Sequence, residues 1–201
     1  MLTMTPTMTT LRQDFFNRPT LIVAEDLLGK VLVRKRGTKV YEGIITEVEA
    51  YDGPQDKACH AHKGCTERTK VMFGPAGHWY VYLCYGMHWM LNIVTGEEGY
   101  PAAVLVRGIR VVSSRALTRD NTTSWFDRAH HDTGHGPGKL TKIFSIDNTL
   151  NAQPAIVKTG LWIEDRGIII SKNSVTRTSR IGVDYAQEWK DKLYRFCLNH
   201  D

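Results

Sequence analysis

The segment Trp79–Val94 constrains the fold more than any other part of this sequence. Trp79–Cys84 is a strongly aromatic stretch, Tyr85-Gly86 favours a turn, and Trp89–Val94 is apolar again. Two apolar stretches joined by a short turn that contains glycine are typical of an antiparallel hairpin. We therefore predict a fold in which hairpins build an antiparallel sheet.

The remaining apolar segments extend this sheet and add few helices. We expect a mixed α/β (α+β) fold with a flexible tail at residues 1–13 and one compact domain at residues 14–201. The expected strands are Lys30–Arg34, Glu42–Tyr51 and Pro101–Val111, with a hairpin at Gly160–Ser171. The expected helices are Arg18–Leu28 and Lys139–Phe144. We expect a basic turn at Arg34–Gly37, a surface segment at Asp56–Lys70 and a loop at residues 119–138.

Composition and charge narrow the function classes. The chain has 201 residues, of which 42% are hydrophobic, so a disordered protein is excluded. Residues 1–100 hold 11 basic and 11 acidic side chains, whereas residues 101–201 hold 15 and 10, so the whole net charge of +5 lies in the second half. Such an excess favours a polyanionic partner. We expect no membrane partner, because no stretch approaches the roughly 18 apolar residues of a membrane span. The four cysteines, with no secretory leader, indicate free thiols in a reducing cell interior.

A crowded cluster of cysteine and histidine runs from Cys59 to Cys65. It places two cysteines and two histidines within seven residues, whereas structural zinc sites separate a cysteine pair from a histidine pair. The signature of zinc-dependent base deaminases is also missing. We therefore predict no metal and no cofactor.

Two acidic side chains share one face of the strand Glu42–Tyr51. Alternation places Glu47, Glu49 and Tyr51 on the same side. Carboxylates at this spacing repel each other unless water, a cation or an arginine relieves them, so the face is either solvated or part of a half-buried cleft. Tyr85 lies on a turn, where an exposed aromatic ring can stack on a base or wedge between base pairs.

Several motifs, in order along the chain, resemble the alkyladenine DNA glycosylase (3-methyladenine DNA glycosylase) family. They are Gly43–Pro54, Ala58–His60, Met72–Phe73, Tyr80–Met87, Leu91–Ile93, Val104–Arg107, Gly136–Leu140 and Arg177–Tyr185. The resemblance implies a curved antiparallel sheet with a protruding hairpin, similar to the C-terminal domain of formyltransferases. It also implies a monofunctional, cofactor-free hydrolase that acts as a monomer on damaged double-stranded DNA. The expected location is the cytoplasm of a bacterium, at the nucleoid, and the expected further partners are the enzymes that repair the abasic site afterwards.

The resemblance further assigns the catalytic residues. Glu49 is then the general base that activates the attacking water, and Arg107 and the backbone around His60 help to hold that water. No lysine occupies an equivalent position in the strand, which argues against a Schiff-base lyase.

The same resemblance assigns the base pocket. Tyr51 lies on one side of the flipped base, with His60 and Tyr82 on the other. Asn92 forms the floor and obstructs the exocyclic amine of guanine, and Tyr85 fills the gap in the duplex. Expected substrates are 3-methyladenine, 7-methylguanine, hypoxanthine and ethenoadenine.

The basic second half supplies candidate phosphate contacts at Lys139, Arg177 and Arg180. Three other interpretations stay open: a nucleic-acid-binding module without catalysis, a hydrolase of free nucleosides, and an accessory domain that grips transfer RNA. Glu49 argues against the first, because a carboxylate near phosphates weakens simple binding. The turn tyrosine and the basic excess favour a polymer over a nucleoside.

Overall fold

A computed structural model describes residues 8–112 and 129–199, with residues 129–135 as backbone alone. Its α-helices are α1 (Gln13–Phe16), α2 (Thr20–Leu27) and α3 (Pro137–Ile143). Its strands are β1 (Thr9–Thr10), β2 (Val31–Arg36), β3 (Lys39–Asp52), β4 (Trp79–Cys84), β5 (His88–Val94), β6 (Ala102–Val112), β7 (Ala129–His135), β8 (Leu161–Asp165), β9 (Val175–Thr178) and β10 (Arg195–Leu198). None of the helices in these ranges has the length and apolar character needed to cross a membrane.

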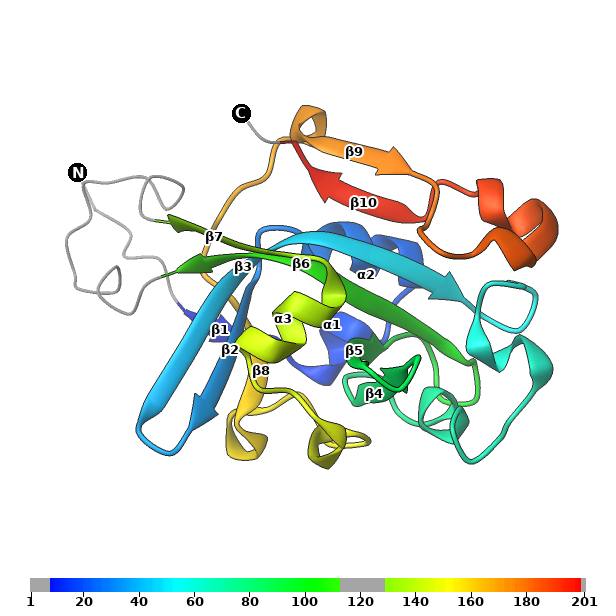
Figure 1. The fold of residues 1–201 in the computed structure, drawn as a ribbon, viewed down its shortest axis with the longest axis horizontal. Helices are drawn as coiled ribbons and strands as arrows, with labels where there is room; N and C mark the ends of the chain where they lie inside the picture. The colour runs from blue at the N-terminus through cyan, green and yellow to red at the C-terminus, as the bar shows by residue number, and fades with distance from the viewer. Residues whose placement is uncertain (1–7, 113–128, 200–201) are drawn as a thin grey trace.

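The strands of the described residues form one ten-stranded sheet (Figure 1). Its main order is β1-β8-β2-β3-β6-β5-β4, with β7 beside β6 and the β9–β10 pair attached to β3. Every one of these pairings is antiparallel. The prediction of a mixed α/β domain built on antiparallel hairpins is therefore confirmed.

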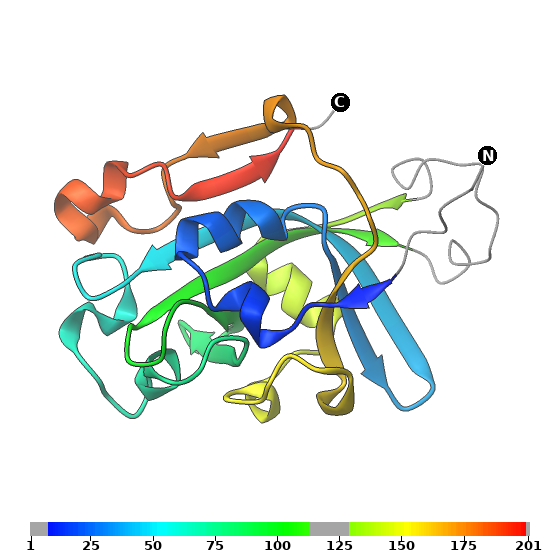
Figure 2. The same cartoon turned by 180° about the vertical axis from the view of Figure 1, so that it is seen from behind.

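The helices cover opposite faces of the sheet. In Figure 1, α3 lies in front of β6, whereas Figure 2 shows α1 and α2 on the reverse side. Helix α2 begins after Pro19, and Val23, Ala24 and Leu27 are fully buried on its inner face. Gly29, at a φ of +79°, then turns the chain into β2, directly after the helix that was expected to end at Leu28. These helices close the main hydrophobic core, which includes Val23 and Leu27 of α2 and Leu140 of α3.

Strand β3 lies at the centre of this arrangement. It pairs with β2, β6 and β10, and its register with β6 shifts on both sides of Glu47, which marks a bulge. Gly108 faces the bulge, and a Cβ added there would lie 2.9 Å from the Cβ of Glu47, so only glycine fits. The bulge bends the strand where its acidic residues lie, as bulges beside functional sites commonly do.

The hairpin β4–β5 ends in a turn whose two central residues are left-handed. Tyr85 has a φ of 49° and Gly86 a φ of 69°, and the Met87 N–H donates to the Cys84 carbonyl oxygen at 3.0 Å. Two successive positive φ angles are what a type I′ hairpin turn requires. The Tyr85 side chain is 89% exposed, which confirms that the tyrosine projects from the tip.

Two predicted elements in the second half are wrong. Leu161–Asp165 forms a strand, but it pairs with β1 and β2 and not with a return strand in 166–171. Arg166 is instead buried in an ion pair with Glu42, which explains why the polar residues after the strand do not form an exposed turn. Within the predicted loop 119–138, Ala129–His135 is strand β7, and residues 119–128 lie outside the described residues.

Three predictions in the first half also need correction. The tail is shorter than residues 1–13, since Thr9–Thr10 pairs with β8 and Leu11 is buried; residues 1–7 lie outside the described ranges. The basic residues before Gly37 belong to strand β2, so the turn begins at Gly37. The segment Asp56–Lys70 is only partly a surface segment, because Asp56 is fully buried in an ion pair with Arg180.

Candidate active site

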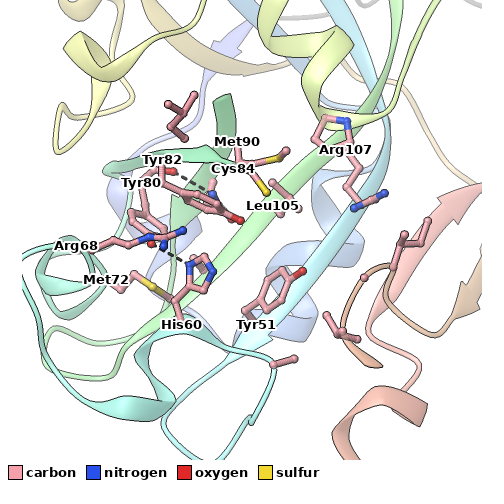
Figure 3. Close-up of a pocket in the computed structure, with 18 of the residues that line it drawn as sticks. Tyr51, His60, Arg68, Met72, Tyr80, Tyr82, Cys84, Met90, Leu105 and Arg107 are labelled. Atoms are coloured by element: carbon pink, nitrogen blue, oxygen red, sulfur yellow. Dashed lines mark hydrogen bonds between the residues drawn. The ribbon is translucent and has the colours of Figure 1, made fainter. Parts of the chain in front are cut away.

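A cavity of about 430 Å³ opens between β3, the β4–β5 hairpin and the segment 181–185 (Figure 3). Its aromatic lining residues are Tyr51, His60, Tyr80, Tyr82, Tyr85 and Tyr185. The 3-10 helices His60–Lys63 and Lys70–Phe73 bring His60 and Met72 to its lower wall. Strand β6 adds Ala103, Leu105 and Arg107, so the structure brings together residues from well-separated stretches of the sequence.

Glu49 lies directly behind the wall of this cavity, and its side chain is fully buried. Its Oε2 accepts hydrogen bonds from the Tyr51 hydroxyl at 2.8 Å and from Nη1 of Arg107 at 3.3 Å. Its Oε1 accepts a hydrogen bond from the Ile181 backbone N–H at 2.8 Å. All three donors belong to residues that line the cavity, so the carboxylate is held at its edge in one fixed orientation.

Glu47 shares its arginine with Glu49. Arg107 donates from Nε to Glu47 Oε1 at 2.8 Å, and Arg195 donates to the same oxygen at 2.7 Å. Burial raises the pKa of Glu47, but the hydrogen bonds from Arg195 and Arg107 outweigh it and the pKa falls below the usual value. Likewise, burial lowers the pKa of Arg107, yet the two glutamates reverse this and raise it. Of the two interpretations of this strand face, the half-buried cleft is correct and the solvated face is wrong.

The imidazole of His60 is an uncharged part of the wall. Burial, with a smaller contribution from the Arg68 cation, lowers the pKa of His60 to about 4. Its Nδ1 is 3.0 Å from the Tyr80 hydroxyl, and its ring meets that of Tyr82 with the centroids 4.7 Å apart and the planes at 71°. Burial also raises the pKa values of Tyr51 and Tyr82, so both phenols keep their protons at neutral pH. The walls are therefore neutral aromatic rings.

Asn92 forms another part of the cavity lining. It lies on β5, its side chain is buried, and its Nδ2 donates to the Tyr80 carbonyl oxygen at 3.0 Å. This hydrogen bond fixes the orientation of the amide among the aromatic residues of the lining.

The predicted phosphate contacts are placed differently from one another. Lys139 is exposed on α3, and Arg177 is half-exposed, close to Glu25 and over the ring of Phe196. Arg180 is buried: it donates to the two carboxylate oxygens of Asp56 at 2.5 and 2.8 Å. The placement of Arg180 therefore does not support a contact with phosphate.

Arg180 instead supports the acidic site from behind. Its guanidinium lies 4.8 Å from the ring centroid of Tyr51, and the next residue, Ile181, donates its N–H to Glu49. Sequence reasoning missed this role and also missed Asp56, Arg68 and Tyr185. Arg180 does lie in one of the family-like motifs, but a motif does not say whether an arginine faces solvent or a buried aspartate.

The cysteine and histidine cluster separates in space. The Cys59 thiol is buried next to the Pro101 carbonyl oxygen, and burial raises its pKa to about 12, whereas Cys65 is exposed. His62 faces the Pro54 carbonyl oxygen and not His60. Among residues 8–112 and 129–199, no group of three or more His, Cys, Asp or Glu side chains is arranged to hold a metal ion.

A cavity with neutral aromatic walls beside a fixed carboxylate has the chemistry suited to enclosing a flat heteroaromatic ring. Residues 14–201 match the family described as Methylpurine-DNA glycosylase (MPG). The chain is 46% identical over 189 residues to a protein of Methanocella arvoryzae named "Putative 3-methyladenine DNA glycosylase", covering 94% of this chain and 92% of that protein. Proteins with the same name from Legionella pneumophila strain Lens and Natranaerobius thermophilus are 42% and 36% identical, over 94% and 92% of this chain and 93% of each relative.

The chain belongs to the methylpurine-DNA glycosylase family. It is a DNA glycosylase, a hydrolase of N-glycosyl bonds that acts in the repair of alkylated DNA. The resemblance stated from the sequence motifs is thereby confirmed.

Proposed function

We propose that this protein removes 3-methyladenine and related alkylated or deaminated purines from duplex DNA. It takes one nucleotide out of the stack, encloses the base in the aromatic cavity and hydrolyses the N-glycosidic bond, leaving an abasic site. The names of the relatives support 3-methyladenine as a substrate. We extend the range to 7-methylguanine, hypoxanthine and ethenoadenine, because neutral aromatic walls stack on any flat purine.

Base flipping fits the shape of the molecule. A base within a duplex is out of reach, so it must leave the stack at a cost of a few kcal/mol. The cavity, at about 430 Å³, is in the size range of small-ligand pockets. Tyr85 stands at its mouth on the exposed hairpin tip, where the ring can fill the space that the nucleotide leaves.

Inside the cavity the base lies between Tyr51 on one side and His60 and Tyr82 on the other. Asn92 meets the edge of the ring and obstructs the exocyclic amine of normal guanine. Lys139 and Arg177 contact the DNA backbone from the basic second half. All of these residues belong to one chain, so a monomer suffices.

Glu49 carries the chemical step. As the bond between the sugar carbon C1′ and the base nitrogen breaks, its electron pair leaves with the base and the sugar acquires oxocarbenium character. Water attacks C1′, and the Glu49 carboxylate takes the proton that the water releases. Arg107 and the backbone near His60 hold the water. Glu49 is fully buried behind its contacts with Tyr51 and Ile181. A small shift of either residue therefore admits the water to the Glu49 carboxylate.

The single observation that carries this proposal is the contact set of Glu49. Three donors from cavity-lining residues fix a carboxylate beside a base-sized space. A module that only bound nucleic acid would gain nothing from a buried carboxylate at that position. A hydrolase of free nucleosides would have no use for an exposed tyrosine on a hairpin tip.

The test is Glu49→Gln, which keeps the shape of the side chain but cannot take the proton. We expect lesion binding to persist and the single-turnover rate of base release to fall by about 100- to 10,000-fold, as for the loss of a general base. The matched control is Glu98→Gln, an exposed glutamate in the loop after β5. Release at near wild-type rate by Glu49→Gln would exclude the assignment. Equal activity of the wild type on free nucleosides and on duplexes would favour the nucleoside hydrolase.

A further inference from the structure

Arg68 places a positive charge against the outer part of the base cavity. Its guanidinium carbon lies 4.6 Å from the ring centroid of Tyr82, and the residue lines the cavity. Figure 3 shows it entering on the side of His60 and Tyr82 that faces away from Tyr51. The π face of Tyr82 that Arg68 covers is thus already occupied by a cation of the protein.

No acidic side chain among the described lining residues offsets this charge. The charged residues of the lining are Arg68 and Arg107, and Arg107 is neutralised by Glu47 and Glu49. On the opposite wall, Arg180 also lies over a tyrosine ring, but Asp56 is its buried partner. Arg68 is therefore the cation whose field extends into the base cavity. After burial, which is the larger cause, Arg68 also contributes to the lowered pKa of His60.

We propose that Arg68 determines the charge preference of the pocket by disfavouring cationic methylated bases relative to neutral ones. This inference rests on the proposed function. A positively charged purine stacked against Tyr82 gains a cation–π attraction of about 0.5–2 kcal/mol at most. A guanidinium on the same ring uses that attraction first and repels the second cation. A neutral base such as hypoxanthine is not repelled by Arg68 and has no cation–π attraction to lose, because it binds by stacking and hydrogen bonding alone.

The size of the effect follows from the attraction that is lost. At about 1.4 kcal/mol per factor of ten, 0.5–2 kcal/mol corresponds to about a 2- to 30-fold change in relative affinity. The Arg68 residue is exposed to solvent, so salt screens its charge and the change is larger at low ionic strength.

The experiment compares duplexes that hold 7-methylguanine or hypoxanthine on a 2′-fluoro sugar, which resists cleavage and leaves binding as the readout. Arg68→Met removes the charge and keeps much of the side-chain length, and Arg68→Lys keeps a charge. The control is Lys70→Met, since Lys70 pairs with Glu67 on the same exposed segment and does not line the cavity.

For Arg68→Met we expect the affinity for the cationic lesion relative to the neutral one to rise by about 2- to 30-fold. Arg68→Lys and Lys70→Met should stay near the wild-type ratio, and added salt should shrink the difference. A wild type that prefers both lesion duplexes over undamaged DNA but shows the same ratio as Arg68→Met would overturn this inference alone. A wild type with no preference for either lesion would overturn the proposed function, and the inference with it.

Discussion

Replacing Asp56 with Asn should destabilise the fold more than any surface change, because it breaks a buried ion pair. The Asp56 carboxylate accepts hydrogen bonds from Nη1 and Nη2 of Arg180 at 2.5 and 2.8 Å. It also accepts the backbone N–H groups of Asp52 at 3.1 Å and Ala58 at 3.0 Å. Asn keeps the size of the side chain but removes the negative charge that balances Arg180.

The magnitude follows from the burial of both partners. The side chains of Arg180 and Asp56 are each 0% exposed, so water cannot replace the lost carboxylate. Removing one partner of a buried pair costs about 3–5 kcal/mol. For a domain of this size, 1 kcal/mol lowers the melting temperature by about 2–4 °C, which gives a loss of about 6–20 °C.

Thermal unfolding of the single variant and of Asp56→Asn/Arg180→Met measures this cost. Methionine removes the unpaired charge. The single asparagine oxygen can still accept one of the two backbone N–H groups, which bind different carboxylate oxygens in the wild type, so the double variant should recover part of the lost stability. A loss below about 1 kcal/mol for the single variant, the level of an exposed ion pair, would contradict the argument. So would a double variant less stable than the single one.

Three further results are expected. Tyr85→Ala should weaken binding to lesion duplex and slow base flipping, which a fluorescent base analogue measures. Its melting temperature should stay close to that of the wild type, since Tyr85 is 89% exposed, and a large fall in that temperature would make Tyr85 a packing residue. The pKa of His60 is lowered to about 4, so the unfolded chain takes up the proton first, near pH 6.5. Stability is therefore complete above pH 6.5 and lost as the pH falls through about 4, and His60→Gln should flatten this part of the stability curve; an unchanged slope would refute the shift. Affinity for undamaged duplex should fall steeply with salt, and Lys139→Gln should reduce the slope of log affinity against log salt by about 1; a slope that Lys139→Gln leaves unchanged would exclude Lys139 as a phosphate contact.

The sequence predicted those parts of the fold that local pattern controls. The hairpin Trp79–Val94, the long strand through Glu49 and the helix that ends before Gly29 all carry their own apolar periodicity and turn residues. Strand β8 was found, but its partner was not. Leu161–Asp165 pairs with β2, more than a hundred residues earlier in the chain, and no local pattern encodes so distant a pairing.

The site shows the same division. Alternation along β3 placed Glu47, Glu49 and Tyr51 together, and the hydrogen bond between Tyr51 and Glu49 agrees with that arrangement. The buried role of Arg180 could not be predicted, because its partner Asp56 lies in a polar segment that is typical of a loop at the surface. A charged residue is called exposed by default, and only the three-dimensional structure reveals the partner that allows it to be buried.

The left-handed backbone of Tyr85 has a consequence for how this protein can be improved. A side chain with a Cβ at a positive φ costs about 1–2 kcal/mol, whereas glycine adopts that conformation freely and asparagine does so more readily than tyrosine. Selection or engineering for heat resistance alone would therefore favour Tyr85→Asn or Tyr85→Gly in a turn whose next residue is already Gly86. Such a variant would melt higher and lose its aromatic tip, so screens for robustness in this family need a DNA-dependent readout to keep the tyrosine.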